Sequence, residues 1–138
     1  MRNARRKARA VQGATVLGVD TEVYLDGRLF GKPPDPGQAR RYLERLSGRT
    51  HEVFSGLVLI HEGIEHSGTA RTEVTFRELD APLIEWYLTS GEWRDRAGGY
   101  AVQGRGAALI ASIDGDYWNV VGLPVALLLD LAPWLLEP

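Results

Sequence analysis

The sequence predicts a mixed α/β domain in which a twisted, mixed β-sheet is flanked by helices. Three observations support this fold class: a strand pair joined at Asp26-Gly27, a second antiparallel hairpin further along, and well-capped helices between the strands. At 138 residues the chain has the size of one domain, so we expect a single domain over residues 1–138.

The first element is expected to be a helix from Arg2 to Val11 that begins almost at the first residue. Ala4, Ala8 and Val11 fall on one face at helical spacing, and the cations occupy the other face. The basic face could be a nucleic-acid-binding arm or simply a solvated surface. We favour the solvated surface and expect no nucleic-acid partner. The net charge is −2, and five cations lie in the first ten residues, so the other 128 residues carry −7.

The stretch from Leu17 to Pro33 organises the rest of the chain. An apolar run is followed directly by Asp20 and Thr21, and the strand continues to Asp26-Gly27, the strongest short hairpin signal in a sequence. Antiparallel pairing then returns Lys32 toward Asp20. A carboxylate and a cation facing one pocket predict a site for phosphate chemistry.

A helix is expected next, because Asp35-Pro36-Gly37-Gln38 has an N-cap residue, a proline at the first helical position and a capping glutamine. It runs to about Leu46 and ends at Ser47-Gly48. The remaining elements are expected in this order: a strand over Thr50–His61, a turn over Gly63–Gly68, a strand over Arg71–Leu79, a short helix over Ala81–Thr89, a strand over Ala107–Ile113, and a last helix with Pro124 at its first position.

A glycine-rich loop separates the short helix from the following strand. Four glycines lie within nine residues, at positions 98, 99, 104 and 106, which is too costly in entropy for a regular element. Such a loop brings its backbone close to a ligand or to another strand. Gln103 lies in this loop.

Two phosphate-binding motifs can be rejected. The run from Gly27 to Lys32 resembles a P-loop, but its spacing is wrong and Pro33 replaces the serine or threonine that would hold magnesium. Gly104-Arg105-Gly106 begins a dinucleotide fingerprint, but Leu109 stands where the third glycine belongs.

Other composition features narrow the class of protein. The chain has no cysteine, no apolar run long enough to cross a membrane and no secretory signal, so we expect a cytoplasmic protein without a membrane partner. His61 and His66 flank the expected turn too irregularly for a zinc pair and are expected at the surface. His51 is expected to make a structural hydrogen bond.

Four candidate site residues remain, and each also has a purely structural explanation. Asp20 could be a hydrogen-bonded strand carboxylate, Lys32 a surface charge, and Gln103 a partner for the loop backbone. Thr21 is a candidate because it adjoins Asp20.

Four blocks of the sequence together resemble one protein family. They read GVDTEVYLDGRLFGKP, RYLERLSGRTHEVFSG, GGYAVQGRG and YWNVVGLPV, and they occur in the family's order. The chain is similar to the Maf family of nucleoside triphosphate pyrophosphatases. The resemblance implies an inosine-triphosphatase-like fold. The Tyr100–Gly104 block resembles the branch that acts on dTTP and UTP.

The resemblance implies hydrolysis between the α and β phosphates, which gives a nucleoside monophosphate and pyrophosphate, with a divalent cation, Mg²⁺ or Mn²⁺. Asp20 matches the family's proton acceptor and could also hold the metal. Thr21 and Gln103 match positions linked to substrate choice. Lys32 and Lys7 match phosphate-binding lysines. A homodimer is also implied.

The family pattern begins with a strand and a Ser-x-Arg-Arg loop that this sequence does not contain. We therefore expect either a shortened sequence or a natural fragment with weak or no activity. The alternative to an active pyrophosphatase is a catalytically impaired nucleotide-binding fragment of the same fold. A weaker alternative is a small RNA-binding protein that uses the basic N-terminus.

Overall fold

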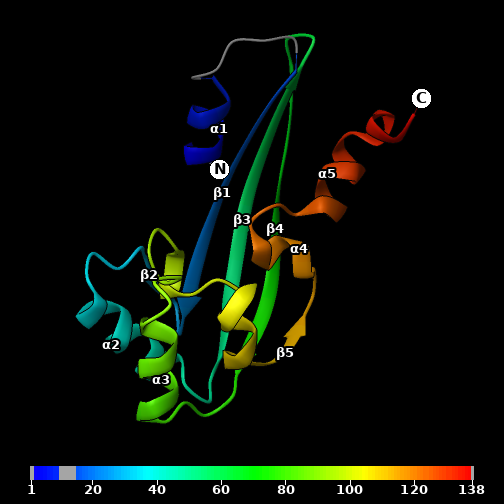
Figure 1. Ribbon diagram of the computed structural model, residues 1–138. Helices are drawn as coiled ribbons and strands as arrows, with labels where there is room; N and C mark the ends of the chain where they lie inside the picture. Colours follow the sequence, from blue (N-terminus) through cyan, green and yellow to red (C-terminus); the bar gives the residue numbers. More distant parts are fainter. Residues whose placement is uncertain (1, 10–14, 138) are drawn as a thin grey trace. The chain divides into compact units, whose positions relative to one another are not determined.

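The computed structural model describes residues 2–9 and 15–137 (Figure 1). Its elements are α1 (Arg2–Arg9), β1 (Thr15–Leu25), β2 (Arg28–Phe30), α2 (Pro36–Leu46), β3 (Thr50–His61), β4 (Ile64–Phe76), α3 (Ala81–Leu88), the 3₁₀ helices η1 (Ala97–Gly99) and η2 (Gly104–Leu109), β5 (Ile110–Asp114), α4 (Tyr117–Val121), α5 (Val125–Leu131) and the 3₁₀ helix η3 (Pro133–Leu136).

The strands form one five-stranded antiparallel sheet in the order β2-β1-β3-β4-β5, which confirms the predicted fold class of a sheet flanked by helices. The predicted hairpin is also confirmed, with Leu25 paired to Arg28 and Val23 to Phe30. Asp26 and Gly27 have φ values of 52° and 77°, as a two-residue hairpin turn requires.

The chain divides into two compact units. The first contains residues 1–21, 54–71 and 116–138, and the second contains residues 22–53 and 72–115. Strands β1, β3 and β4 each contribute residues to both units. The single domain over residues 1–138 stays a prediction.

The first unit has a helix packed on each face of its strands. Successive side chains of a strand point to opposite faces, so Val58 packs with Ala4 and Ala8 of α1, whereas Leu57 and Leu59 pack with the C-terminal helices. The second cluster contains a buried alanine and several partly buried hydrophobic residues: Ala132, Val19, Leu123, Leu127, Leu128, Leu131 and Trp134. Trp134 therefore belongs to the same hydrophobic cluster as the last helix.

In the second unit, α2 and α3 lie side by side and η1 packs against α2 (Figure 1). The predicted start of α2 is confirmed, because the Asp35 carboxylate accepts a hydrogen bond of 2.7 Å from the backbone N–H of Gln38. Asp80 caps α3 in the same way, with the N–H of Leu83 at 2.9 Å. The unit's largest fully buried side chains include Leu43, Leu46, Val53, Val74, Phe76, Tyr87 and Leu109.

Three predicted boundaries are wrong. The turn expected over Gly63–Gly68 is only two residues long, because Glu62 adopts a φ of 51° before Gly63, and β4 therefore runs over Ile64–Phe76 instead of Arg71–Leu79. The strand expected over Ala107–Ile113 is β5, Ile110–Asp114. The 3₁₀ helix η2 occupies the preceding residues.

Pro124 is the N-cap residue of α5 and not its first helical residue, because its ψ of 86° is not helical. Its carbonyl still accepts the first helical hydrogen bond, from the N–H of Leu128 at 3.0 Å. The first helix is described as far as Arg9. Val11, its predicted last residue, lies outside the described residues.

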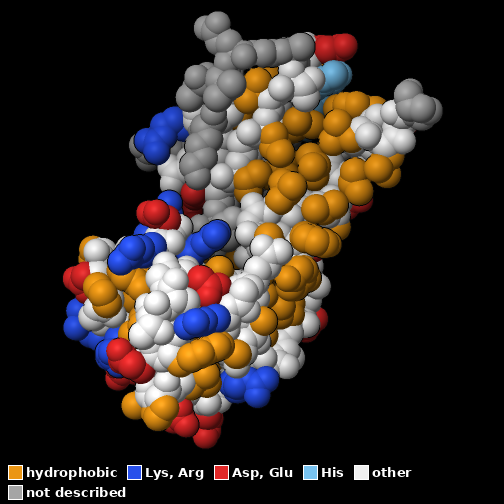
Figure 2. Space-filling model, viewed as in Figure 1, with side chains coloured by type: hydrophobic (Ala, Val, Ile, Leu, Met, Phe, Trp, Pro, Cys, Tyr) orange, Lys and Arg blue, Asp and Glu red, His pale blue; other side chains and the backbone are white. Residues whose placement is uncertain are grey.

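Hydrophobic side chains gather at the surface over the C-terminal helices (Figure 2). Trp118, Leu135 and Leu136 are the most exposed large ones there, at 51%, 45% and 73%. Within residues 2–9 and 15–137, none of the helices has the length and apolar character to pass through a lipid bilayer.

Candidate functional site

Asp20 and Thr21 lie next to each other on β1, and both are partly buried. The amide Nδ2 of Asn3, on α1, donates a hydrogen bond of 3.4 Å to Oδ2 of Asp20. The hydroxyl of Thr21 is 2.9 Å from the hydroxyl of Ser55 on β3, and Ser55 is 1% exposed. Each side chain is thus oriented by a polar neighbour that is distant in the sequence.

Helix α1, which contains Lys7, rests directly on β1 at Gly18. A Cβ atom at Gly18 would lie 2.2 Å from the carbonyl oxygen of Ala4 and 2.7 Å from the backbone nitrogen of Ala8, so only glycine allows this approach. The guanidinium of Arg5 also forms two hydrogen bonds, of 2.9 and 3.1 Å, with the carboxylate of Glu65 on β4. The backbone of Lys7 is therefore held by its helix, whereas its side chain lies outside the described residues.

Lys32 follows β2 and is exposed. The glycine-rich loop contacts the backbone on each side of it. The carbonyl of Gly31 accepts a hydrogen bond of 3.1 Å from the N–H of Gly98, and a Cβ at Gly99 would lie 3.5 Å from Pro33. The segment that contains Lys32 is therefore fixed to η1.

Gln103 is exposed and immediately precedes η2. Both carboxylate oxygens of Glu92 accept from the backbone N–H of Arg105, at 3.1 and 3.2 Å. A Cβ at Gly106 would lie 1.5 Å from the carbonyl oxygen of Ala101. Gly106 thus lets the loop backbone fold closely on itself, and Glu92 anchors the loop two residues after Gln103.

A second anchor is the Arg105 side chain. Its Nη1 donates hydrogen bonds to the carbonyl oxygen of Trp86, at 3.0 Å, and to the hydroxyl of Thr89, at 3.3 Å. Its guanidinium lies 5.0 Å from the centre of the Trp86 ring. The glycine-rich loop is therefore fastened to α3 by one arginine.

His51 makes the structural hydrogen bond that the sequence predicts. Its Nε2 is 2.6 Å from the hydroxyl of Tyr100, and both side chains are buried. Burial lowers the pKa of His51 from 6.5 to about 4, so this imidazole is neutral near pH 7. Burial also raises the pKa of Tyr100. The pair is a buried contact between the start of β3 and the glycine-rich loop.

The other two histidines are partly buried, beside an aromatic residue. The ring of His61 stacks on Trp134 with centroids 5.3 Å apart, and the ring of His66 meets the same tryptophan edge-on at 5.1 Å. Within the described part of the chain, no three histidine or acidic residues gather as a metal cluster would require.

The five predicted site residues are divided between the two units. The first unit contains Lys7, Asp20 and Thr21, and the second contains Lys32 and Gln103. Sequence reasoning missed Asn3, Ser55 and Glu92, which bond to Asp20, to Thr21 and to the backbone of the glycine-rich loop. No local motif identifies these three, because each is paired with a residue 13 to 34 positions away.

The match to known proteins covers almost the whole chain. The family described as Maf-like protein matches residues 1–133. The chain is 51% identical to a dTTP/UTP pyrophosphatase of Thermococcus gammatolerans over 131 residues, which are 93% of this chain and 71% of the relative. It is 50% identical to a dTTP/UTP pyrophosphatase of Pyrococcus furiosus over 117 residues, which are 85% of this chain and 62% of the relative. It is 52% identical to a dTTP/UTP pyrophosphatase of Symbiobacterium thermophilum over 128 residues, which are 90% of this chain and 66% of the relative.

The resemblance read from the four sequence blocks is thus confirmed by whole-chain comparison. The chain belongs to the Maf family.

Proposed function

We propose that the protein is a nucleoside triphosphate pyrophosphatase that converts dTTP and UTP to the nucleoside monophosphate and pyrophosphate. The observation that supports this most strongly is the identity of about 50% with dTTP/UTP pyrophosphatases over 85% to 93% of the chain. The family match over residues 1–133 includes Asp20, Thr21, Lys32 and Gln103, the residues proposed to act on the nucleotide.

In this proposal, Asp20 is the proton acceptor. A water molecule attacks one of the two phosphorus atoms of the α–β anhydride, and the bond from that atom to the bridging oxygen breaks. The nucleoside monophosphate and pyrophosphate separate, and a proton of the water passes to the Asp20 carboxylate. A partly buried carboxylate suits this task because it is fixed by its surroundings and still reaches solvent. The hydrogen bond from Asn3 to Oδ2 helps to orient this carboxylate.

The other four residues are proposed to bind and select the nucleotide. Lys7 and Lys32 compensate the negative charge of the triphosphate, which is most effective where water is excluded. The Gln103 amide has both a donor and an acceptor and can therefore read the edge of a pyrimidine. Thr21 contributes to substrate choice beside Asp20.

A divalent cation, Mg²⁺ or Mn²⁺, is proposed as the cofactor. Asp20 supplies one carboxylate, which suits a cation that is shared with the substrate. Magnesium is often held by one or two carboxylates together with substrate phosphates. When bound, the cation would neutralise phosphate charge.

The proposal also covers the enzyme's location, its partners and its oligomeric state. It acts in the cytoplasm on a free nucleotide, without a nucleic-acid or membrane partner, and it forms a homodimer. Sedimentation at several protein concentrations tests the dimer, which requires a species of twice the chain's 15.3 kDa.

A nucleotide panel with Mg²⁺ or Mn²⁺ tests the activity. We expect dTTP and UTP to be hydrolysed faster than the purine triphosphates, with one pyrophosphate released per monophosphate formed. Release of inorganic phosphate in place of pyrophosphate would show cleavage between the β and γ phosphates and would contradict the proposal. Calorimetric binding of dTTP without any hydrolysis would instead support a catalytically impaired nucleotide-binding protein.

A further inference from the structure

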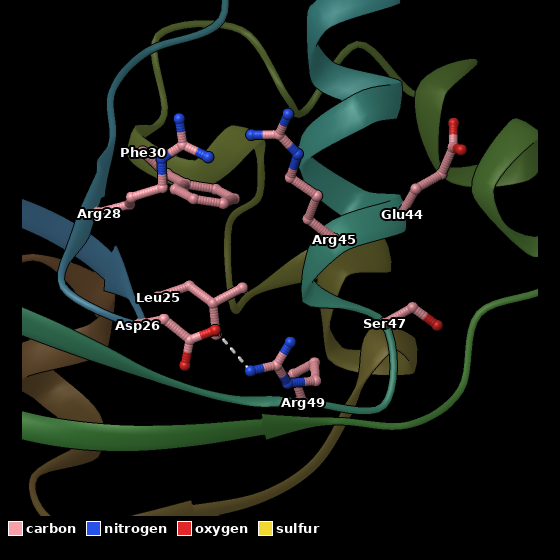
Figure 3. Close-up of a pocket in the computed structure, with 8 residues that line it drawn as sticks. All are labelled: Leu25, Asp26, Arg28, Phe30, Glu44, Arg45, Ser47 and Arg49. Carbon is pink, nitrogen blue, oxygen red and sulfur yellow. Dashed lines mark hydrogen bonds and ion pairs between the residues drawn. The ribbon is translucent and has the colours of Figure 1, made fainter.

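A pocket of about 430 Å³ lies at the tip of the β1–β2 hairpin, entirely within the second unit (Figure 3). It is formed by the ends of β1 and β2, the last turns of α2, and the segment that leads into β3. The lining residues are Leu25, Asp26, Arg28, Phe30, Glu44, Arg45, Ser47 and Arg49. Among these, arginines outnumber the acidic residues.

Only one of the three arginines is neutralised within the pocket. Arg49 forms an ion pair of 2.6 Å with Asp26. Figure 3 shows Arg28 and Arg45 on opposite sides of the pocket, with their guanidinium groups pointing toward each other, while the Glu44 carboxylate points away from both. Neither Arg28 nor Arg45 has an ion-pair or hydrogen-bond partner among residues 2–9 and 15–137.

Both arginines are exposed, and an anion between their guanidinium groups would interact favourably with each of them. Two other arginines on α2, the helix that contains Arg45, have partners. Arg40 pairs with Glu85, and Arg41 donates two hydrogen bonds, of 3.1 and 2.9 Å, to Oε1 of Gln38. The convergence of two unpartnered guanidinium groups thus distinguishes the pocket from the surface around it.

The walls of the pocket indicate the class of anion. Phe30 and Leu25 are 2% and 6% exposed, so neither offers a free face on which a nucleobase could stack. Guanidinium groups bind phosphate oxygens in pairs, through two parallel N–H donors. We propose that this pocket binds a small phosphate-bearing anion between Arg28 and Arg45, with the phosphoryl group as the recognised part.

Site-resolved titration tests this proposal without relying on enzyme activity. Inorganic phosphate and pyrophosphate are titrated into ¹⁵N-labelled protein, with acetate at matched ionic strength as the control anion. We expect saturable shifts of the Gly27 and Ser47 backbone amides with both phosphates and none with acetate. Absence of saturable shifts at these two amides would overturn the proposal, whatever happens at Asp20 or Gln103.

The paired variants are Arg28→Gln with Arg45→Gln, and Arg41→Gln is the matched control on the same helix. We expect the double variant to weaken phosphate binding at the Gly27 amide at least tenfold and Arg41→Gln to change it less than twofold. Equal binding in the double variant and the control would contradict the proposal. If the double variant does not fold, Arg28→Lys and Arg45→Lys replace it, because they keep the charge and lose the paired donors. Unchanged binding in both lysine variants would also contradict the proposal.

Two further arms identify the source of the phosphate. If UMP binds at the Gly27 amide at least tenfold more tightly than inorganic phosphate, the anion is a nucleotide phosphate. If the two bind there equally, the anion is a free phosphate ion. Both support recognition of the phosphoryl group. Binding of an RNA oligonucleotide with no saturation by phosphate or pyrophosphate would show a polyanion surface and overturn the proposal.

Discussion

The imidazole of His51 and the hydroxyl of Tyr100 share a buried hydrogen bond of 2.6 Å, although 49 residues separate them in the sequence. Phe76 meets both rings edge-on, with centroid distances of 5.0 Å to His51 and 4.7 Å to Tyr100. Tyr100 lies between η1 and Gln103. The cluster therefore ties the glycine-rich loop to the start of β3.

The low pKa of His51 predicts a loss of stability in acid. In the unfolded chain His51 titrates near its ordinary value of 6.5, but in the folded chain its pKa is about 4. Between these values the unfolded chain binds a proton that the folded chain does not, so folding stability falls as the pH drops from about 6.5 to about 4. The effect amounts to roughly 3 kcal/mol at most.

Urea unfolding of the wild type and His51→Gln, at about pH 7 and about pH 4.5, measures this effect. We expect the wild type to lose more stability than His51→Gln over that interval, and His66→Gln to behave as the wild type does. An equal loss in wild type and His51→Gln would show that other groups cause the acid sensitivity.

Gly18 predicts a second effect on stability. Gly18→Ala places a methyl group against the α1 backbone, which must move, at a cost of roughly 2 kcal/mol or more. Gly31→Ala is the control, because a Cβ there has no atom within 4 Å and its expected change is within about 0.5 kcal/mol. Urea unfolding and hydrogen exchange of α1 amides measure both variants. Equal stability in the two variants would contradict the close packing of α1 on β1.

The local elements could be predicted from sequence because their signals are local. Asp26-Gly27 specifies its hairpin, and Asp35 with Gln38 specifies the start of α2. The turn predicted over Gly63–Gly68 is instead at Glu62-Gly63, a position that the sequence does not indicate because glutamate rarely adopts positive φ and is not a usual hairpin signal. The start of β4 was misplaced for the same reason.

The candidate site, too, could be predicted only where its signals are local in the sequence. Asp20, Thr21, Lys32 and Gln103 could be selected from residue type and neighbouring sequence. The contacts that orient them, from Asn3, Ser55 and Glu92, depend on tertiary packing. The pocket between Arg28 and Arg45 likewise exists only after the hairpin folds beside α2.

Glu92 predicts an effect on substrate binding. Glu92→Ala removes the carboxylate that accepts from the Arg105 backbone, so the loop that contains Gln103 should loosen. We expect KM for dTTP and UTP to rise roughly tenfold, because a small displacement of a binding group is costly. Glu85→Ala, which removes only an exposed ion pair with Arg40, should leave KM unchanged. Similar KM values in the two variants would refute the role of the anchor.

The hydrogen bond between Thr21 and Ser55 predicts a third effect on stability. Thr21→Val keeps the shape of the side chain but leaves the buried hydroxyl of Ser55 without this partner, at a cost of about 1 kcal/mol. Thr21→Ser keeps the hydroxyl and should retain most of the stability. Thermal unfolding measures both, and a valine variant as stable as the serine variant would show that the hydrogen bond is unimportant.

The proposed chemistry requires a carboxylate at position 20. The most direct measurement is the rate of pyrophosphate release from dTTP and UTP by the wild type and by Asp20→Asn, at saturating nucleotide and divalent cation. Asparagine keeps the size of the side chain and cannot accept the proton, so we expect kcat to fall by roughly 10²- to 10⁴-fold while the protein stays folded. A kcat for Asp20→Asn equal to that of the wild type would contradict the proposal that Asp20 is the catalytic base.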